Sequence, residues 1–160
     1  MAERRTILAG MAGGLVWAVA VIFAGLNGGG AFLPPPLAIP GALIGPGLVM
    51  IAMIGSLARR RFFDDSHIDG QAFETGSPGW VDQQVLNNTV EQAVLAMLIW
   101  PFVALTLGGT VVIWMGTAFA AARVLFWIGY RRAPALRAFG FAATFYTTVL
   151  VGIWTLIVWL

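Results

Sequence analysis

Apolar residues in this sequence run in five long stretches, separated by short segments that are rich in glycine, proline or charged residues. A helix needs about 20 residues to cross the ~30 Å hydrocarbon core of a bilayer, and each stretch approaches or exceeds that length. The pattern therefore predicts five transmembrane helices, over residues 7–26, 37–58, 84–107, 111–130 and 136–160.

Glycine and proline mark the connections between these stretches. Residues 27–36 hold three consecutive glycines and three consecutive prolines, which weaken a helix and remove its backbone donors, so we expect an external connection there. Pro40 and Pro46 fall early in the second stretch and predict an irregular start or a kink. The shortest connection, 106–110, predicts an antiparallel hairpin, and Pro134 marks the join between the last two helices.

Threading the chain through five crossings places all its arginines on one side: Arg4, Arg5, Arg59, Arg60, Arg61, Arg123, Arg131, Arg132 and Arg137. The acidic residues fall on that same side or just inside it. Positive charge marks the cytoplasmic side, so the N-terminus is predicted in the cytoplasm and the C-terminus in the periplasm. The clusters 59–61 and 131–132 are interpreted as topological anchors. Trp154 and Trp159 fit an aromatic belt at the far interface.

The first stretch could be read as a signal peptide, but it exceeds the ~7 to 15 apolar residues of such a segment. No convincing small-residue cleavage site follows it. We expect it to be a retained helix.

Composition supports a membrane protein and excludes several kinds of chemistry. The chain is 59% apolar and 10% charged, against roughly 45 to 50% and 25% in soluble domains, so its excess apolar surface must face lipid or partner subunits. The arginines form no stripe that would bind nucleic acid. The chain has no cysteine and one histidine, so we expect no metal site, and any reactive thiol must come from a substrate. The alanine-rich, lysine-free composition favours a GC-rich bacterial source and hence an inner membrane.

Polar residues lie on one face of the third predicted helix, at its charged end. Gln84, Asn88 and Glu91 follow the spacing i, i+4, i+7, which puts them on the same side of a helix. An ionisable group at this depth usually faces the bundle interior and has a partner. Glu91 is therefore predicted either to pair with an arginine that locks two helices together or to bind a ligand.

The fourth predicted helix carries a matching set, in which Arg123, Trp127 and Tyr130 have the same spacing. Arg123 lies one to two turns inside the membrane, so it needs a carboxylate or a bound anion, and Glu91 is the expected carboxylate. Arg137 lies at the start of the last helix, where the helix dipole and free backbone donors favour an anion.

Three short motifs resemble a known family. Residues 122–137, with Ala-Arg, then Gly-Tyr, then Leu-Arg, look like the MAPEG signature (membrane-associated proteins in eicosanoid and glutathione metabolism). Residues 88–91 resemble the family's N-x-x-E, and 58–60 resemble the Ala-Arg-Arg that ends its first helix. The similarity covers about 48–160, and its nearest type is a microsomal glutathione transferase.

This resemblance implies an all-α integral membrane fold, a four-helix MAPEG-like bundle with an extra N-terminal helix. Residues 1–36 would form that helix and an external loop, and 37–160 the bundle, with a cytoplasmic loop over 59–83.

Family members that are enzymes form homotrimers and bind glutathione between subunits. The resemblance implies that glutathione contacts Asn88, Glu91, Tyr130 and Gln84, and that Arg123 supports this side of the binding site. Arg137, or Arg60 from the next subunit, would stabilise the thiolate. A thiol with a pKa of about 8.5 is mostly protonated at neutral pH, and a guanidinium favours its nucleophilic anion. The thiolate would then attack a hydrophobic electrophile that arrives from the bilayer.

Three residues differ from those common in MAPEG enzymes, and these differences argue against assigning the family's glutathione chemistry directly to this chain. Gln84 replaces a common arginine, while Gln92 and Phe126 stand where tyrosines are often found. Each removes a charge or hydroxyl that would hold an anionic tripeptide. The alternative is a non-catalytic subunit of this fold in a larger membrane complex, with the first helix as a docking surface. Transport through Glu91 and Arg123 is a weaker hypothesis, because one polar cluster offers no continuous pathway.

Overall fold

The computed structural model describes residues 2–28 and 32–160. Within these ranges the regular secondary structure is helical, with no strand. The helices are α1 (Ala2–Asn27), α2 (Pro35–Phe62), α3 (Pro78–Thr106), α4 (Gly109–Arg132) and α5 (Pro134–Trp159). All of them are long and apolar enough to cross a membrane. The predicted all-α fold with several membrane spans is therefore confirmed. Several helices begin earlier or end later than the apolar stretches, because the adjoining polar turns are helical too.

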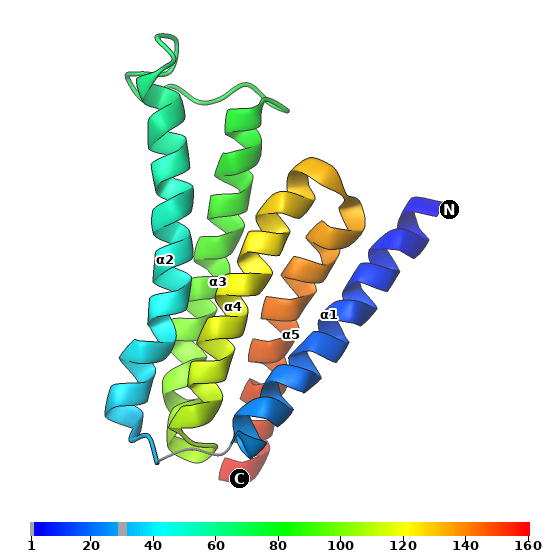
Figure 1. The fold of residues 1–160 in the computed structure, drawn as a ribbon, viewed down its shortest axis with the longest axis vertical. Helices are drawn as coiled ribbons and strands as arrows, with labels where there is room; N and C mark the ends of the chain where they lie inside the picture. Colours follow the sequence, from blue (N-terminus) through cyan, green and yellow to red (C-terminus); the bar gives the residue numbers. More distant parts are fainter. Residues whose placement is uncertain (1, 29–31) are drawn as a thin grey trace.

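The helices form an elongated bundle with alternating directions (Figure 1). The end of α2, the start of α3 and the α4–α5 turn all lie at the upper end in this view, together with the long 63–77 connection. The C-terminus lies at the opposite end. Helix α1 runs on the outside of the bundle and packs along α5 and α4. The polar turns predicted on one side are thus brought to one end of the molecule.

The turns follow from backbone chemistry. Gly108, between α3 and α4, has a φ of 104°, which suits glycine and closes the predicted hairpin. Ala133 alone separates α4 from α5, in an extended conformation that precedes Pro134.

Prolines open α2 without disturbing it. Pro35 and Pro36 fall in its first turn, where backbone N–H groups have no helical partner. The helix runs unbroken through Pro40 and Pro46, so its start is regular, and the alternative of a kink at these prolines stays a prediction. Residues 29–31 of the predicted 27–36 connection lie outside the described residues.

Small residues let α2 and α4 meet backbone to backbone. A Cβ on Gly116 would lie 2.0 Å from the carbonyl oxygen of Ala42, so no larger side chain fits without a helix shift. Gly116 of α4 is therefore used in helix packing within the chain. Deeper in the bundle, the indole of Trp100 is buried edge-on against Phe119 and donates a hydrogen bond to the Thr148 hydroxyl at 3.2 Å.

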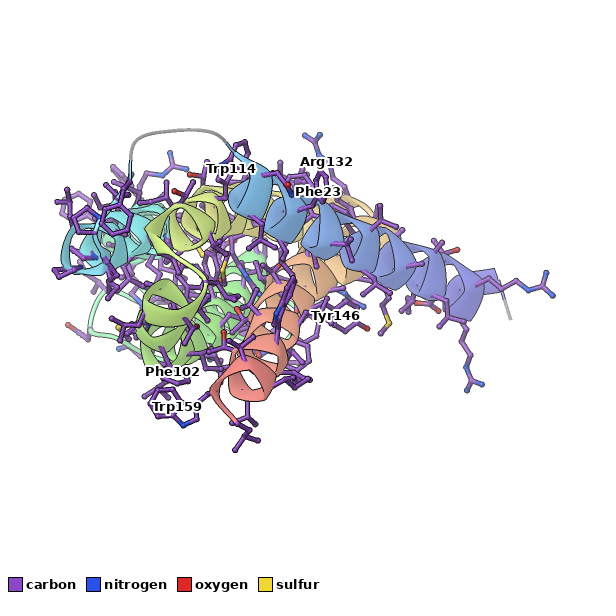
Figure 2. The ribbon with its side chains drawn as sticks, turned by 90° about the horizontal axis from the view of Figure 1, so that it is seen from below. Phe23, Phe102, Trp114, Arg132, Tyr146 and Trp159 are labelled. Atoms are coloured by element: carbon purple, nitrogen blue, oxygen red, sulfur yellow. The ribbon has the colours of Figure 1, made fainter. Side chains whose placement is uncertain are left out.

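The outer surface of the bundle is largely apolar. Leu98 is 72% exposed and Phe23 is 66% exposed, and both belong to helices that can span a membrane. Near the C-terminus, the rings of Phe102 and Trp159 meet at 5.1 Å between centroids on the outside of the bundle (Figure 2). Such a surface is stable only against lipid or other apolar chains.

Candidate functional site

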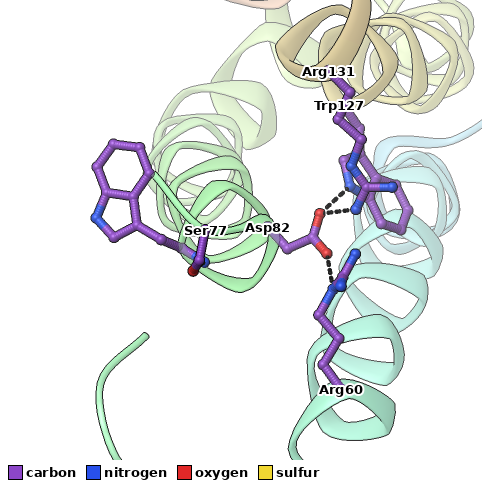
Figure 3. A network of polar contacts seen from close by, with 6 residues as sticks. Arg60, Ser77, Asp82, Trp127 and Arg131 are labelled. Carbon is purple, nitrogen blue, oxygen red and sulfur yellow. Dashed lines mark hydrogen bonds and ion pairs between the residues drawn. The ribbon is translucent and has the colours of Figure 1, made fainter. Parts of the chain in front are cut away.

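A buried carboxylate ties three helices together at the polar end of the bundle. The side chain of Asp82, on the first turns of α3, is 1% exposed. It accepts hydrogen bonds from Arg60 Nε of α2 at 2.7 Å and from Trp127 Nε1 of α4 at 2.9 Å. Arg131 of α4 completes the set as an ion pair (Figure 3). The cluster joins α2, α3 and α4 through one acidic group.

This cluster changes how two predicted residues are understood. Arg131 was interpreted as a topological anchor, yet it pairs with the buried Asp82. Arg60 was predicted to stabilise a thiolate in the next subunit, and the structure places it on Asp82 of its own chain, bound through Nε. Asp82 itself was missed, because spacing along one helix does not show which arginines approach it from two others. The available signal was a carboxylate just inside a membrane span, which needs partners.

Arg123 is fully buried, and its partners differ from the prediction. Its Nη1 donates to Asn88 Oδ1 at 2.8 Å and its Nη2 donates to the Thr144 hydroxyl. The guanidinium lies 4.7 Å from the ring of Phe126 and 5.5 Å from that of Phe119. Amide, hydroxyl and aromatic faces thus surround the cation, and aromatic faces attract it electrostatically.

The predicted direct ion pair between Arg123 and Glu91 is wrong. Among the ion pairs of the described residues, none joins these two groups. Instead, Asn88 Nδ2 donates to Glu91 Oε2 at 3.1 Å while its Oδ1 accepts from Arg123. Asn88 can bridge them because an amide both donates and accepts. Glu91 lies on the exposed surface of α3, so the burial of Arg123 is not shared by its predicted partner.

Close packing of α4 against α5 brings Arg137 over Tyr130. A Cβ on Gly129 would lie 2.3 Å from the backbone nitrogen of Arg137, so the two helices touch here. The guanidinium carbon of Arg137 lies 5.1 Å from the centroid of the Tyr130 ring. No carboxylate pairs with Arg137 among the ion pairs of residues 2–28 and 32–160. The group is therefore a cation without an acidic partner in the described part of the chain.

Asn88, Tyr130 and Arg137 open onto one groove of about 300 Å³. Its remaining lining is apolar: Ile7, Met11, Phe126, Ala138 and Phe141. The groove thus joins three predicted binding residues, with Arg123 behind Asn88 and Glu91 at the other side of that amide. Gln84, one turn earlier on α3, does not line it, and Arg60 belongs to the Asp82 cluster.

Two of the three residues that differ from the expected family pattern, Gln92 and Phe126, lie in the core of this structure. Gln92 is 5% exposed, and Phe126 is 3% exposed with its ring edge-on to Tyr130 at 5.1 Å. Phe126 also provides an aromatic face to Arg123. Phe126 therefore both lines the groove and packs against Arg123, whereas Gln92 is buried and does not line it.

The loop after α2 has a local polar cluster of its own. The Asp64 carboxylate accepts hydrogen bonds from the Ser66 hydroxyl at 2.6 Å and from the Ser66 backbone at 3.1 Å, and lies 2.9 Å from His67 Nδ1. The Ser66 hydroxyl above all, aided by His67, holds the pKa of Asp64 below its ordinary 3.8, against the opposing effect of desolvation. A second groove, of about 440 Å³, lies beside this loop and includes Arg60.

The fold and the groove define a class: a multi-pass helical membrane protein with a groove that includes Arg137 near the polar end of its bundle. The model of the MAPEG family matches residues 36–157, and the chain belongs to that family. No curated protein and no solved structure is similar enough to match it. Helix α1 lies wholly outside the matched range.

Proposed function

We propose that this protein is a membrane-bound glutathione-dependent transferase or peroxidase, of the microsomal glutathione transferase type, that acts on hydrophobic electrophiles. Membership of the MAPEG family supports a glutathione-related role. One observation carries the assignment: Arg137 lies beside Tyr130 and Asn88 at a common groove, with no carboxylate paired to it in the described chain.

Each residue has a role that follows from its chemistry. Arg137 would hold the glutathione sulfur as a thiolate, because an adjacent cation lowers the pKa of a thiol. Tyr130 and Asn88 would form hydrogen bonds with the peptide, and Glu91 would accept a hydrogen bond from its amino group. Arg123 would act as a positioning residue, since it fixes the amide of Asn88 from behind.

The groove in one chain has a volume near the lower limit for ligand pockets, which hold roughly 300 to 1,000 Å³. We therefore propose that the remaining part of the tripeptide is held by a neighbouring subunit of a homotrimer. Arg60 and Gln84 are the candidate residues of that second wall. Arg60 is held by its Nε, which fixes its side chain at the polar end. In this proposal the protein lies in an inner membrane with its polar end in the cytoplasm.

Thiolate absorbance tests the proposal directly. Purified protein in mild detergent is titrated with glutathione, and conjugation to 1-chloro-2,4-dinitrobenzene is followed in parallel. Arg137→Gln should raise the pKa of the bound thiol by about one unit, so the thiolate signal at neutral pH should fall about fivefold when the wild-type pKa is close to the pH of the assay, and at most tenfold. Arg132→Gln is the matched control, because Arg132 is exposed and does not line the groove. A wild-type protein that shows neither thiolate nor conjugate at millimolar glutathione would end the enzyme proposal.

The second candidate is a non-catalytic subunit of a membrane complex. It is favoured by Gln92 and Phe126, two buried side chains that lack the hydroxyl a tyrosine would offer to the tripeptide. Gentle solubilisation followed by native mass measurement separates the two candidates. A stable unrelated partner supports the subunit, whereas a homotrimer alone supports the enzyme.

A further inference from the structure

Helix α1 contributes side chains to the same groove as the proposed binding residues. Ile7 and Met11, one turn apart on α1, line it together with Arg137. Because the match to the family begins at residue 36, this wall is additional to the part of the chain that defines the family.

The position of this wall is fixed by backbone contact. A Cβ on Gly10 would lie 2.3 Å from the carbonyl oxygen of Ala135, at the start of α5. Gly14, one turn later, is equally close-packed, since its Cβ would lie 2.5 Å from that of Ala142. Helix α1 therefore packs closely on α5 at these two glycines, and this packing places Ile7 and Met11 at the groove.

The groove has two chemically different parts. Asn88, Tyr130 and Arg137 supply the polar part, where an anion is favoured. Met11 and Ile7 of α1, with Phe126 and Phe141, supply the apolar part. A ligand that fits both is an anionic sulfur next to a small apolar partner.

We propose that α1 forms the subsite for the hydrophobic electrophile, within the same chain that binds the thiolate. This inference rests on the proposed function for its reaction, and adds the substrate class: a small apolar electrophile about the size of one aromatic ring. With a chloroarene, the thiolate forms the S–C bond, the C–Cl bond breaks and chloride leaves. The thiol proton is lost to water before this step.

A substitution that fills the apolar part tests this subsite. Met11→Trp should raise KM for 1-chloro-2,4-dinitrobenzene by about tenfold or more, because the indole would occupy volume that the substrate ring needs, and small changes of fit in an apolar pocket change affinity by about 10- to 200-fold. The KM for glutathione should stay unchanged. Leu8→Trp, on the same helix but 63% exposed, is the matched control and should leave both values unchanged. Equal KM values for the two variants would overturn the inference.

A photolabelling experiment decides the inference even if glutathione does not bind. The wild-type protein is irradiated with 4-hexylbenzophenone, and labelled methionines are located by mass spectrometry. Excess 1-chloro-2,4-dinitrobenzene should reduce labelling of Met11 about tenfold, but not that of Met97, which is 51% exposed on α3. Competition at Met11 without any thiolate would sink only the glutathione proposal. If glutathione forms a thiolate but the competitor does not reduce the labelling of Met11 more than that of Met97, only the α1 subsite is refuted.

Discussion

Replacing Asp82 by asparagine should destabilise the polar end of the bundle. The carboxylate is nearly inaccessible and bonds Arg60, Trp127 and Arg131 from two other helices. Asparagine keeps one acceptor oxygen, which can still serve Trp127, but its amide nitrogen would face a second donor on Arg60. One charge-assisted hydrogen bond is therefore lost outright, and another becomes a bond to a neutral group.

The magnitude follows from the exposure of the partners. A hydrogen bond to a charged group contributes roughly 1.5 to 3 kcal/mol, and removal of one partner of a buried pair costs about 3 to 5 kcal/mol when the remaining charge is trapped. Here the side chains of Arg60 and Arg131 are 33% and 44% exposed, so water and headgroups can solvate them. We expect Asp82→Asn to lower the free energy of unfolding by about 2 kcal/mol.

Unfolding in mixed micelles, with increasing sodium dodecyl sulfate and far-UV circular dichroism as the signal, measures this difference. Asp69→Asn is the control, because Asp69 is exposed in the loop and its substitution should change stability by less than about 0.5 kcal/mol. The double variant Asp82→Asn with Arg60→Gln should lose less than the sum of the two single variants. Equal stability of the Asp82 and Asp69 variants would refute the claim that this carboxylate holds three helices together.

Two further predictions concern packing and the loop. Gly116→Ala should destabilise the bundle by about 1 to 3 kcal/mol in the same assay, because its Cβ would overlap the Ala42 carbonyl; Gly55→Ala, with open space around its Cβ, is the control, and equal effects would contradict close α2–α4 packing. Ser66→Ala should raise the depressed pKa of Asp64 toward its ordinary value in a ¹³C NMR titration. Because that pKa is lowered on folding, the stabilisation by the carboxylate exists above its ordinary pKa and disappears as pH falls through the folded value. An unchanged pKa would show that the hydroxyl is not the main cause.

The sequence by itself determined the number of helices, their turns and the end at which their polar residues gather. Membrane-spanning helices satisfy all their backbone hydrogen bonds internally, so their existence follows from apolar length alone. The resemblance to the MAPEG family also predicted that Asn88, Tyr130 and Arg137 belong to one site, whereas helical spacing alone showed only which residues share a face of the same helix.

Only the tertiary structure decided which charged group meets which. Asp82 was overlooked, and Asn88 rather than Glu91 contacts the buried Arg123, because the rotation of each helix about its axis is set by side-chain packing across helices. Contact between α1 and the groove was likewise invisible in the sequence, since Gly10 and Met11 are unremarkable in a membrane helix until α5 is placed against them. Periodicity fixes the face on which a residue lies, and packing between helices fixes what that face meets.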